Sequence, residues 1–294
     1  MRFLLACLLL AFPALGFAQQ PDILEVVNIN GEIDQGTASS IATSVDGINA
    51  NPKIKAVLLV IDSPGGSVTA SSAIYEDLSR LKVPVVAWCQ SVCAFGGVYV
   101  MMAPSVKYIA IRTETITGSV GVIMQMMRYN RLLEFIKVDP KTYRSGPLKD
   151  AGNPTRASEA AEETYLQGIV TELAGRFYAL VKKARPKISA DGWKELKTAR
   201  ILIGPDAVKL GLVDAVATRE QAEAKAKELS KSKTIYTRDE LKKMSSAADA
   251  PPSFHAPDLN VAMALQDVHW LVKTTKEIMA GETVRFAYRM PYSF

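Results

Sequence analysis

Apolar and polar positions follow one another in an order that predicts an α/β fold. Lys55–Ile61 is a continuous apolar segment that ends at Asp62, which is typical of a strand buried on both faces of a parallel sheet. Residues 67–81 then have helical spacing, and Val83–Trp88 predicts the next strand. The same patterns predict a strand at 23–27, a helix that begins within 39–45 and ends near 49–52, a helix at 95–102 and a strand at 108–111.

The alternation of strands and helices also indicates where chemistry belongs. Parallel strands are joined by right-handed crossovers, and ligands bind in such folds beyond the carboxyl ends of the strands. We therefore expect functional residues just after Ile61 and just after Trp88.

The first residues form a separate hydrophobic pattern. Arg2 precedes an apolar run at residues 3–15, and small residues follow at Gly16 and Ala18, which predicts an export signal over residues 1–18. The run is shorter than the ~20 residues that span a bilayer, although an uncleaved anchor remains the alternative. We expect an exported protein, periplasmic or extracellular, that is soluble or peripherally associated with a membrane.

Composition narrows the class of protein. The chain is 48% hydrophobic and 22% charged, as in ordinary globular proteins, and its length fits a domain at residues 19–234 with an extension at 235–294. The net charge of +5 comes from scattered residues with no basic tract among aromatics, which disfavours nucleic-acid binding. No cofactor motif occurs, and the isolated His255 and His269 do not indicate a metal site. After signal removal Cys89 and Cys93 remain, and in an oxidising compartment they either form a disulfide or simply pack.

A glycine-rich turn follows the Ile61 strand. Residues 62–67 are Asp-Ser-Pro-Gly-Gly-Ser, in which the N–H groups of Gly65 and Gly66 can converge on an oxyanion. The structural alternative is an ordinary strand-to-helix turn with Ser67 as the helix cap.

Four other segments accompany this turn. They are Ala-Phe-Gly-Gly-Val-Tyr at 94–99, Thr-Ile-Thr-Gly-Ser-Val-Gly-Val at 115–122, Tyr-Arg-Ser-Gly at 143–146 with Lys-Asp at 149–150, and the segment 207–214 that ends in Gly-Leu-Val-Asp. In order and spacing the five segments closely resemble the signal peptide peptidase A family over about residues 23–217. The resemblance implies a ClpP/crotonase-like fold of repeated ββα units in a superhelix. It also implies a homo-oligomer whose active sites can involve neighbouring protomers, and a serine–lysine dyad that cleaves residual signal peptides and other membrane-associated peptides.

Both dyad positions depart from the family pattern. The resemblance places the nucleophilic serine at Phe95 and the basic lysine at Arg144. A phenyl ring has no nucleophile, and a guanidinium stays protonated at physiological pH, so neither residue can perform its family role. The sequence predicts a serine peptidase homologue with lost or altered catalysis. The alternative is a non-catalytic peptide-binding or scaffold protein, whereas a crotonase-type acyl-CoA enzyme conflicts with export.

Substitute catalytic residues exist in the sequence. Ser91 and Cys93 precede Phe95, and Lys149 follows Arg144, so either could form a dyad with this lysine. A shift of two or four residues would displace the nucleophile by several ångströms, which typically costs ~100-fold in rate. The alternatives are that Ser91 caps a turn, that Cys93 packs or pairs with Cys89, and that Lys149 is solvated.

The residues around the two dyad positions agree with the family pattern. A peptide carbonyl could bind near Gly65, Gly66 and Gly96, and an extended peptide could pair with strand edges near Ser67 and Val68 and near Ser119. Phe95 would either project into the former catalytic centre or fill the core. Beyond Asp214 the pattern predicts a charged helix at 220–232, a linker at 247–252, an amphipathic helix at 265–280 and an aromatic, basic end at 284–294.

Overall fold

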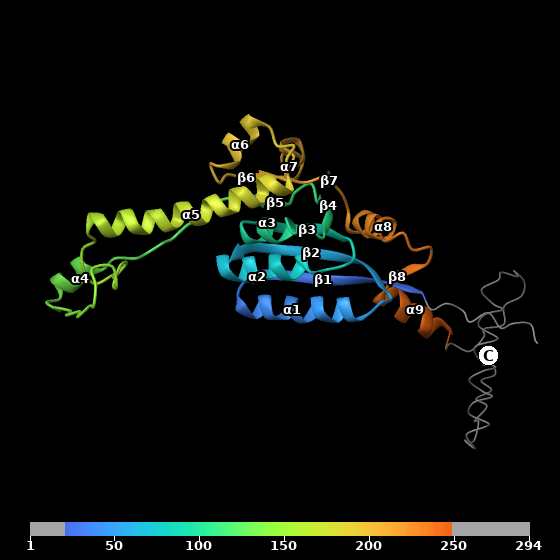
Figure 1. The fold of residues 1–294 in the computed structure, drawn as a ribbon, viewed down its shortest axis with the longest axis horizontal. Coiled ribbons are helices and arrows are strands. Elements are labelled where there is room, and N and C mark those ends of the chain that lie inside the picture. The colour runs from blue at the N-terminus through green and yellow to red at the C-terminus, as the bar shows by residue number, and fades with distance from the viewer. Residues whose placement is uncertain (1–20, 249–294) are drawn as a thin grey trace, which may run out of the picture. The chain divides into compact units, whose positions relative to one another are not determined.

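The computed structural model describes residues 21–248 and has a mixed α/β architecture (Figure 1). Strands and helices alternate in its first part, as the sequence predicts. The elements in that part are β1 (Asp22–Ile33), α1 (Gln35–Ala50), β2 (Ile54–Gly66), α2 (Val68–Ser79), β3 (Val85–Ala94), α3 (Gly96–Met101), β4 (Val106–Ile111) and β5 (Ile116–Gly118). They are followed by α4 (Asn130–Phe135), α5 (Ala160–Ala184), α6 (Ala190–Leu196), β6 (Ile201–Ile203), α7 (Gly204–Leu210), β7 (Ala215–Val216), α8 (Arg219–Ser230), β8 (Ile235–Thr237) and α9 (Arg238–Ala248).

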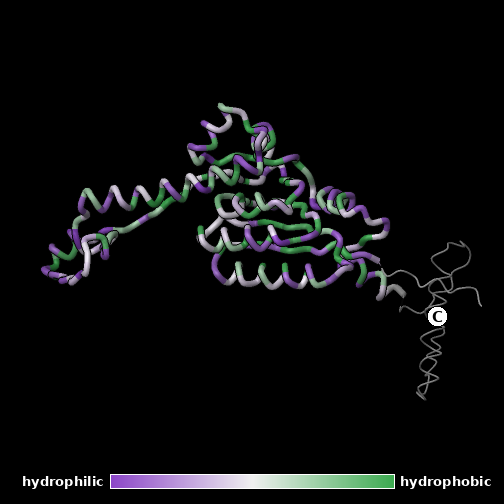
Figure 2. The backbone as a smooth tube through the Cα atoms, in the orientation of Figure 1, coloured by the Kyte–Doolittle hydropathy of each residue, from purple (hydrophilic) through white to green (hydrophobic). Residues whose placement is uncertain are grey.

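The strands form one mostly parallel sheet. Its order is β6-β5-β3-β2-β1, and Ile235 at the start of β8 extends it beyond β1. Successive residues of β2 alternate between two hydrophobic clusters, because Val57, Leu59 and Ile61 belong to one and Ala56, Leu58 and Val60 to the other. This burial on both faces confirms the prediction for this strand, and Figure 2 shows the hydrophobic backbone of the central strands.

The strand β3 is longer than predicted, because it continues beyond a bulge to Ala94. Ile61 of β2 pairs with Cys89, but Ser63 pairs with Cys93, so two residues of β2 face four residues of β3. Before the bulge β3 pairs with β4, and after it β3 pairs with β5. The bulge therefore divides the sheet and turns the last residues of β3 toward α3.

A long arm extends from this core. We define the arm as residues 122–172, which comprise the loops around α4 and the first half of α5. Only the second half of α5 packs on the core, through Ala174, Phe177 and Val181. Figure 1 shows α4 and the start of α5 at the free end of the arm, well away from α3.

The chain divides into two compact units, and the boundary between them in the sequence follows Ile235. In the second unit, Thr237 begins α9 with reciprocal hydrogen bonds, because its hydroxyl accepts from Glu240 N at 3.2 Å and its own N–H donates to Glu240 Oε2 at 2.6 Å. The predicted charged helix at 220–232 is confirmed by α8. Residues 1–18, most of the linker at 247–252, the helix at 265–280, the end at 284–294 and both histidines lie outside the described residues. Between residues 21 and 248, no helix has both the length and the hydropathy required to cross a bilayer.

Candidate active site

The chain makes a sharp turn at Phe95, between β3 and α3. Phe95 has φ 46° and ψ −106°, a conformation that few non-glycine residues adopt. Its N–H donates to Gly118 O at 3.1 Å, and its carbonyl accepts from Tyr99 N at 2.9 Å. A strained strand-to-helix turn of this kind presents a side chain at the carboxyl ends of the strands, where nucleophiles of hydrolases stand. The turn is retained although its side chain is a phenyl ring.

The glycine-rich turn after β2 packs directly against Phe95. Gly65 has φ +102°, and a Cβ there would lie 2.6 Å from Gly96 N and 2.7 Å from Phe95 Cδ1. Gly66 has φ +156°, and a Cβ there would overlap the backbone of Ile33. Both positions therefore require glycine for conformation and for space.

The N–H group of Gly65 has a different hydrogen-bond partner from the one that the sequence predicts. It donates to the buried Ser63 Oγ at 3.1 Å, so it is not directed to an external oxyanion. Gly96 is the first residue of α3, a position whose N–H has no partner within the helix. Gly96 is buried where the turn at Phe95 packs against Gly65.

The ring of Phe95 packs between the core and α5. Its centroid lies 6.1 Å from that of Phe177, with an interplanar angle of 65°, and Phe177 in turn stacks on Tyr99 at 5.1 Å. Phe95 is partly buried against the main core cluster. The side chain therefore fills the space beside Gly65 and also anchors α5.

Ser67 and Val68 form the start of a helix. Ser67 Oγ accepts from Ala70 N at 3.3 Å, so Ser67 caps α2, and Val68 is the first residue of that helix. The predicted strand edge at these residues is wrong, because the chain there is already helical.

The predicted peptide-binding edge near Ser119 is also wrong. Thr117 of β5 pairs with Leu202 of β6, and Ser119 N donates to Arg200 O at 3.0 Å. The strand β6 therefore covers the side of β5 that an extended peptide would need. The exposed end of the sheet is β6 itself, where Ile201 and Ile203 are about half exposed.

The two cysteines are free thiols in this structure, which agrees with the packing alternative and not with the disulfide. Both are fully buried, and burial raises the pKa of the Cys93 thiol well above its usual value, with a further contribution from Cys89. A thiol that resists ionisation is a poor nucleophile and reacts slowly in disulfide exchange. Cys93 is therefore unsuited to act as a nucleophile.

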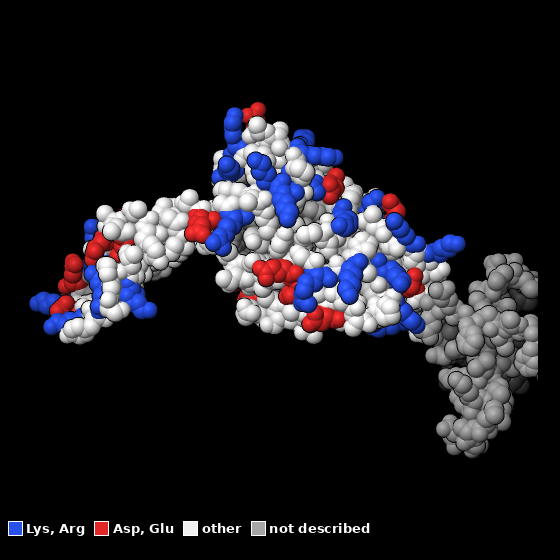
Figure 3. All heavy atoms as spheres, viewed as in Figure 1, with Lys and Arg blue, Asp and Glu red and all other residues white. Residues whose placement is uncertain are grey.

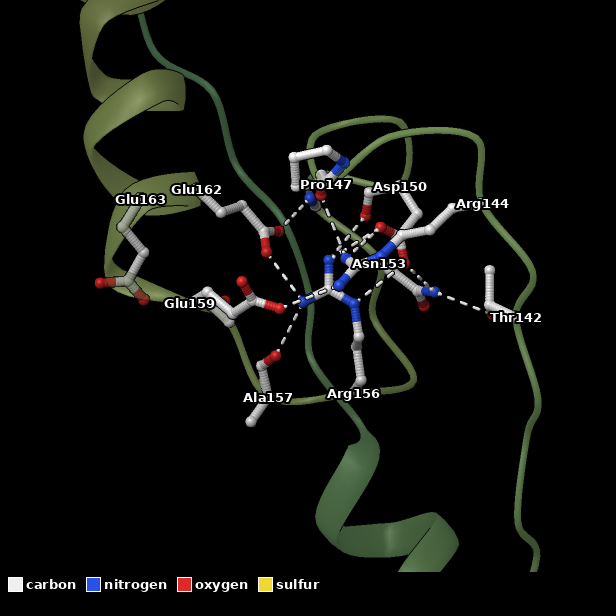
Figure 4. Close-up of polar contacts among 12 residues, drawn as sticks. Thr142, Arg144, Pro147, Asp150, Asn153, Arg156, Ala157, Glu159, Glu162 and Glu163 are labelled. Atoms are coloured by element: carbon white, nitrogen blue, oxygen red, sulfur yellow. Dashed lines mark hydrogen bonds and ion pairs between the residues drawn. The ribbon is translucent and has the colours of Figure 1, made fainter.

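Arg144 belongs to an ion cluster at the free end of the arm (Figure 4). Its guanidinium donates to Asp150 Oδ1 at 2.7 Å, to Glu159 Oε1 at 3.1 Å and to Pro147 O at 3.1 Å. These carboxylates raise the pKa of Arg144 further, so it stays protonated. Arg144 is a structural residue of the arm in this chain.

A second arginine forms the centre of the same cluster. Arg156 makes a two-pronged contact with Asp150, from Nε at 2.9 Å and from Nη2 at 3.1 Å, and its Nη1 lies 2.8 Å from Glu162 Oε2. Glu162 is buried and also accepts from Gly152 N. Hydrogen bonds from Arg156 and then Arg144 hold the pKa of Asp150 far below its ordinary value. Sequence inspection missed Arg156 and Glu162, because only the folded loop brings them together.

The structure does not bring the predicted substitute residues together within one chain. Ser91 is exposed on the bulge of β3, whereas Lys149 is exposed within the arm, in the turn that follows Arg144. No group of three or more His, Cys, Asp or Glu side chains within residues 21–248 is arranged to hold a metal ion.

Comparison with known proteins identifies the family. The sequence profile of "Peptidase family S49" matches residues 77–233, which is more than half of the chain. The chain belongs to peptidase family S49. A second profile, "Clp protease", matches residues 23–117, and with the mostly parallel sheet it confirms the ClpP/crotonase-like fold. Family S49 consists of serine-type peptidases, which are hydrolases.

Three relatives with protease names are similar to this chain over about two thirds of its length. "Putative protease slr0021" of Synechocystis sp. is 36% identical over 198 residues, which cover 67% of this chain and 70% of the relative. "Protease 4" of Salmonella typhi is 30% identical over 220 residues, 71% of this chain and 35% of that protein. "Serine protease SPPA, chloroplastic" of Arabidopsis thaliana is 28% identical over 193 residues, 65% of this chain and 28% of that protein. The chain thus spans most of the first relative and about a third of the other two.

Proposed function

We propose that this chain is an exported S49 homologue that does not hydrolyse peptides through a serine–lysine dyad. The observation that carries the proposal is the side chain at the β3–α3 turn. Phe95 places its ring against Gly65 and Phe177, in the space that a nucleophile and its substrate would need. The second support is that Arg144, at the family base position, is engaged with Asp150 and Glu159.

The test is a hydrolysis assay on the purified mature chain. Unstructured apolar peptides and activated esters are the substrates, and the expected result is no turnover above the buffer rate. Ser91→Ala and Cys93→Ala serve as companion variants. Turnover in the wild type that either variant abolishes would refute the proposal and identify a substitute nucleophile.

Export is part of the proposal and rests on residues 1–18. Its check is the N-terminal mass of the protein recovered from the envelope or the medium of the cells that produce it. A mature chain that begins near Gln19 is expected. A chain that keeps Met1 and sediments with membranes would instead support the uncleaved anchor.

We also infer that the chain forms homo-oligomers through the arm. Seventeen large hydrophobic residues are exposed within residues 21–248, and twelve of them lie in the arm. Phe135 is 83% exposed, Met127 80% and Ile123 81%. A patch of this extent is typical of protein interfaces rather than of monomer surfaces. Within the ClpP-like group, whose members are oligomeric, a second copy of the chain is the natural partner.

A second function, peptide binding without cleavage, is favoured by the free edge of β6. Ile201 and Ile203 present exposed apolar side chains there, and β6 lies beside Gly118, which bonds to Phe95. An extended peptide could add to this edge as a further strand. Calorimetric titration with an unstructured apolar peptide tests it. Ile201→Glu with Ile203→Glu should abolish the heat of binding, whereas Val216→Glu on β7 should preserve it; equal binding by both variants would exclude this edge.

A further inference from the structure

Three sulfur atoms meet in the main core next to the Phe95 turn. Met101 Sδ lies 3.9 Å from Cys89 Sγ and 3.7 Å from Cys93 Sγ. Met101 Sδ is thus in contact with both thiols, and we refer to these three sulfur atoms as the sulfur triangle. All three side chains are fully buried. A serine–lysine dyad at positions 95 and 144 would use none of these three side chains.

The bulge in β3 creates this arrangement. Cys89 and Cys93 are four residues apart and would point to well-separated places on a regular strand, about 13 Å apart at ~3.3 Å per residue. The bulge folds the residues between them out of the strand and brings the two thiols together. The end of α3 supplies Met101 from the opposite side.

Hydrogen bonds fix the backbone that carries the two thiols. The Thr115 hydroxyl donates to Gln90 O at 2.6 Å, and the Thr117 hydroxyl donates to Cys93 O at 2.6 Å. Asp62 Oδ1 accepts from Val92 N at 2.9 Å within the bulge. The sulfur triangle is therefore held in place before any ligand arrives, which lowers the cost of binding one.

We propose that Cys89, Cys93 and Met101 form a binding site for a soft monovalent metal ion of the Cu(I) class. Thiolate and thioether sulfurs are the ligands that Cu(I) prefers, and no imidazole joins them within the described residues. Metal–thiolate bonds are ~2.3 Å long, so a single ion can bond to Met101 Sδ and to a cysteine Sγ that lies 3.7–3.9 Å from it without movement of the backbone.

Binding of Cu(I) can leave the net charge of the buried site unchanged. Cu(I) displaces the proton of one thiol, a sulfur–copper bond replaces the sulfur–hydrogen bond, and the proton leaves to solvent. The copper keeps its oxidation state, so no oxidant or reductant takes part. One cation enters for one proton lost, and the buried cluster gains no net charge. The second thiol can stay protonated and coordinate through its lone pair.

The test is an anaerobic Cu(I) titration of the reduced, full mature chain against a chromogenic Cu(I) chelator. The expected result is uptake of one equivalent, with thiolate-to-copper absorption in the ultraviolet and an X-ray absorption shell of sulfur alone. Met101→Leu keeps the packing volume and should weaken the affinity by at least about tenfold. Met102→Leu, at the next buried methionine, is the matched control and should bind as the wild type does.

A wild type that leaves all copper with the chelator overturns the proposal, and so does copper binding that Met101→Leu and Met102→Leu change equally. If a variant fails to fold, the wild type still decides the matter through its absorption spectrum. Nitrogen or oxygen neighbours around copper would place the ion elsewhere and refute the site. Zn(II) in place of Cu(I) should bind more weakly, because it favours four ligands.

Discussion

At position 95 the backbone and the side chain have opposite effects on stability. A left-handed conformation costs a non-glycine residue ~1–3 kcal/mol. The ring offsets this cost by packing on Phe177 and Gly65, as aromatic pairs of this geometry add ~0.5–1.5 kcal/mol beyond the area they bury. The hydrogen bond from Phe95 N to Gly118 O fixes the turn whatever the side chain is. The turn itself is therefore compatible with a serine.

The first prediction follows because the turn at position 95 does not depend on the side chain there. The double variant Phe95→Ser with Arg144→Lys should gain weak peptidase activity, whereas each single variant should stay inactive, because a serine needs a base and a base needs a nucleophile. The measurement compares initial rates on an unstructured apolar peptide. Since the arm carries residue 144 away from α3 in its own chain, oligomerisation must be verified by light scattering (Figure 1). An assembled but inert double variant would show that the site has lost more than its dyad.

The second prediction concerns the close approach of Gly65. Gly65→Ala should lower the free energy of unfolding by about 2–4 kcal/mol, because a Cβ would meet Gly96 N at 2.6 Å in a backbone conformation that disfavours alanine. Urea unfolding monitored by circular dichroism measures the change. Gly47→Ala is the control: its Cβ would meet nothing within 4 Å in α1, so it should stabilise by about 0.5–1 kcal/mol. An unchanged midpoint for Gly65→Ala would show that the turn can shift.

Sequence inspection located the turn residues well but missed what they contact. Residues 62–67 and 95–97 were expected at the carboxyl ends of strands, and they lie there, because hydrophobic runs determine where strands end. The hydrogen bond from Gly65 to Ser63 and the contact of Phe95 with Phe177 depend on tertiary packing. No local pattern contains that information.

At the scale of elements, the bulge explains why β3 was predicted too short. The predicted strand ends at Trp88, whereas the strand in the structure continues past the polar Gln90 and Ser91 to Ala94. The pairing of β6 with β5 could not be predicted either, because a strand of three residues is too short to show a hydrophobic alternation. The positions of β1 to β4 were predictable from the sequence, while the full lengths of β1 and β3 and the three-residue strands were not.

The arm supplies the third prediction, on pH. The pKa of Asp150 is depressed in the folded state by Arg156 and Arg144, and the pKa of Glu162 by Gly152 N and Arg156. A depressed carboxyl pKa stabilises the fold above the unfolded value near 4, and this stabilisation is lost as the pH falls below it. Hydrogen exchange of residues 144–162 should therefore accelerate between pH 4 and pH 2 beyond the intrinsic change.

Arg156→Gln is the matched variant for this experiment. It removes the donor shared by Asp150 and Glu162, so the segment should already exchange fast at neutral pH. The amides of residues 56–60 in β2, a segment with no carboxylate, serve as the internal reference. If acid opens β2 and residues 144–162 together, then the cluster does not control the arm.

At the scale of the whole molecule, the arm combines exposed apolar residues with charge. Figure 3 shows basic and acidic side chains together at its free end, beside uncharged surface. Figure 2 shows hydrophobic stretches in the loops before α4 and in the first half of α5. An isolated protomer would leave this surface in water, which is unfavourable.

The fourth prediction is that the oligomer depends on the arm. Met127→Glu with Phe135→Glu should convert the assembly to monomers, because two buried carboxylates without partners oppose association. Light scattering after size-exclusion chromatography measures the mass. Met244→Glu changes an exposed methionine outside the arm and should leave the mass unaltered. A wild type that is monomeric at high concentration would refute the interface.

The backbone turn at Phe95 has a consequence for how this gene can change. The hydrogen bond from Phe95 N to Gly118 O involves the backbone alone, so the same turn can form with phenylalanine or with serine. In the genetic code, phenylalanine and serine codons can differ at one base, and so can those of arginine and lysine. With codons of that kind, the serine and lysine that the family resemblance implies at positions 95 and 144 lie two point mutations from this sequence.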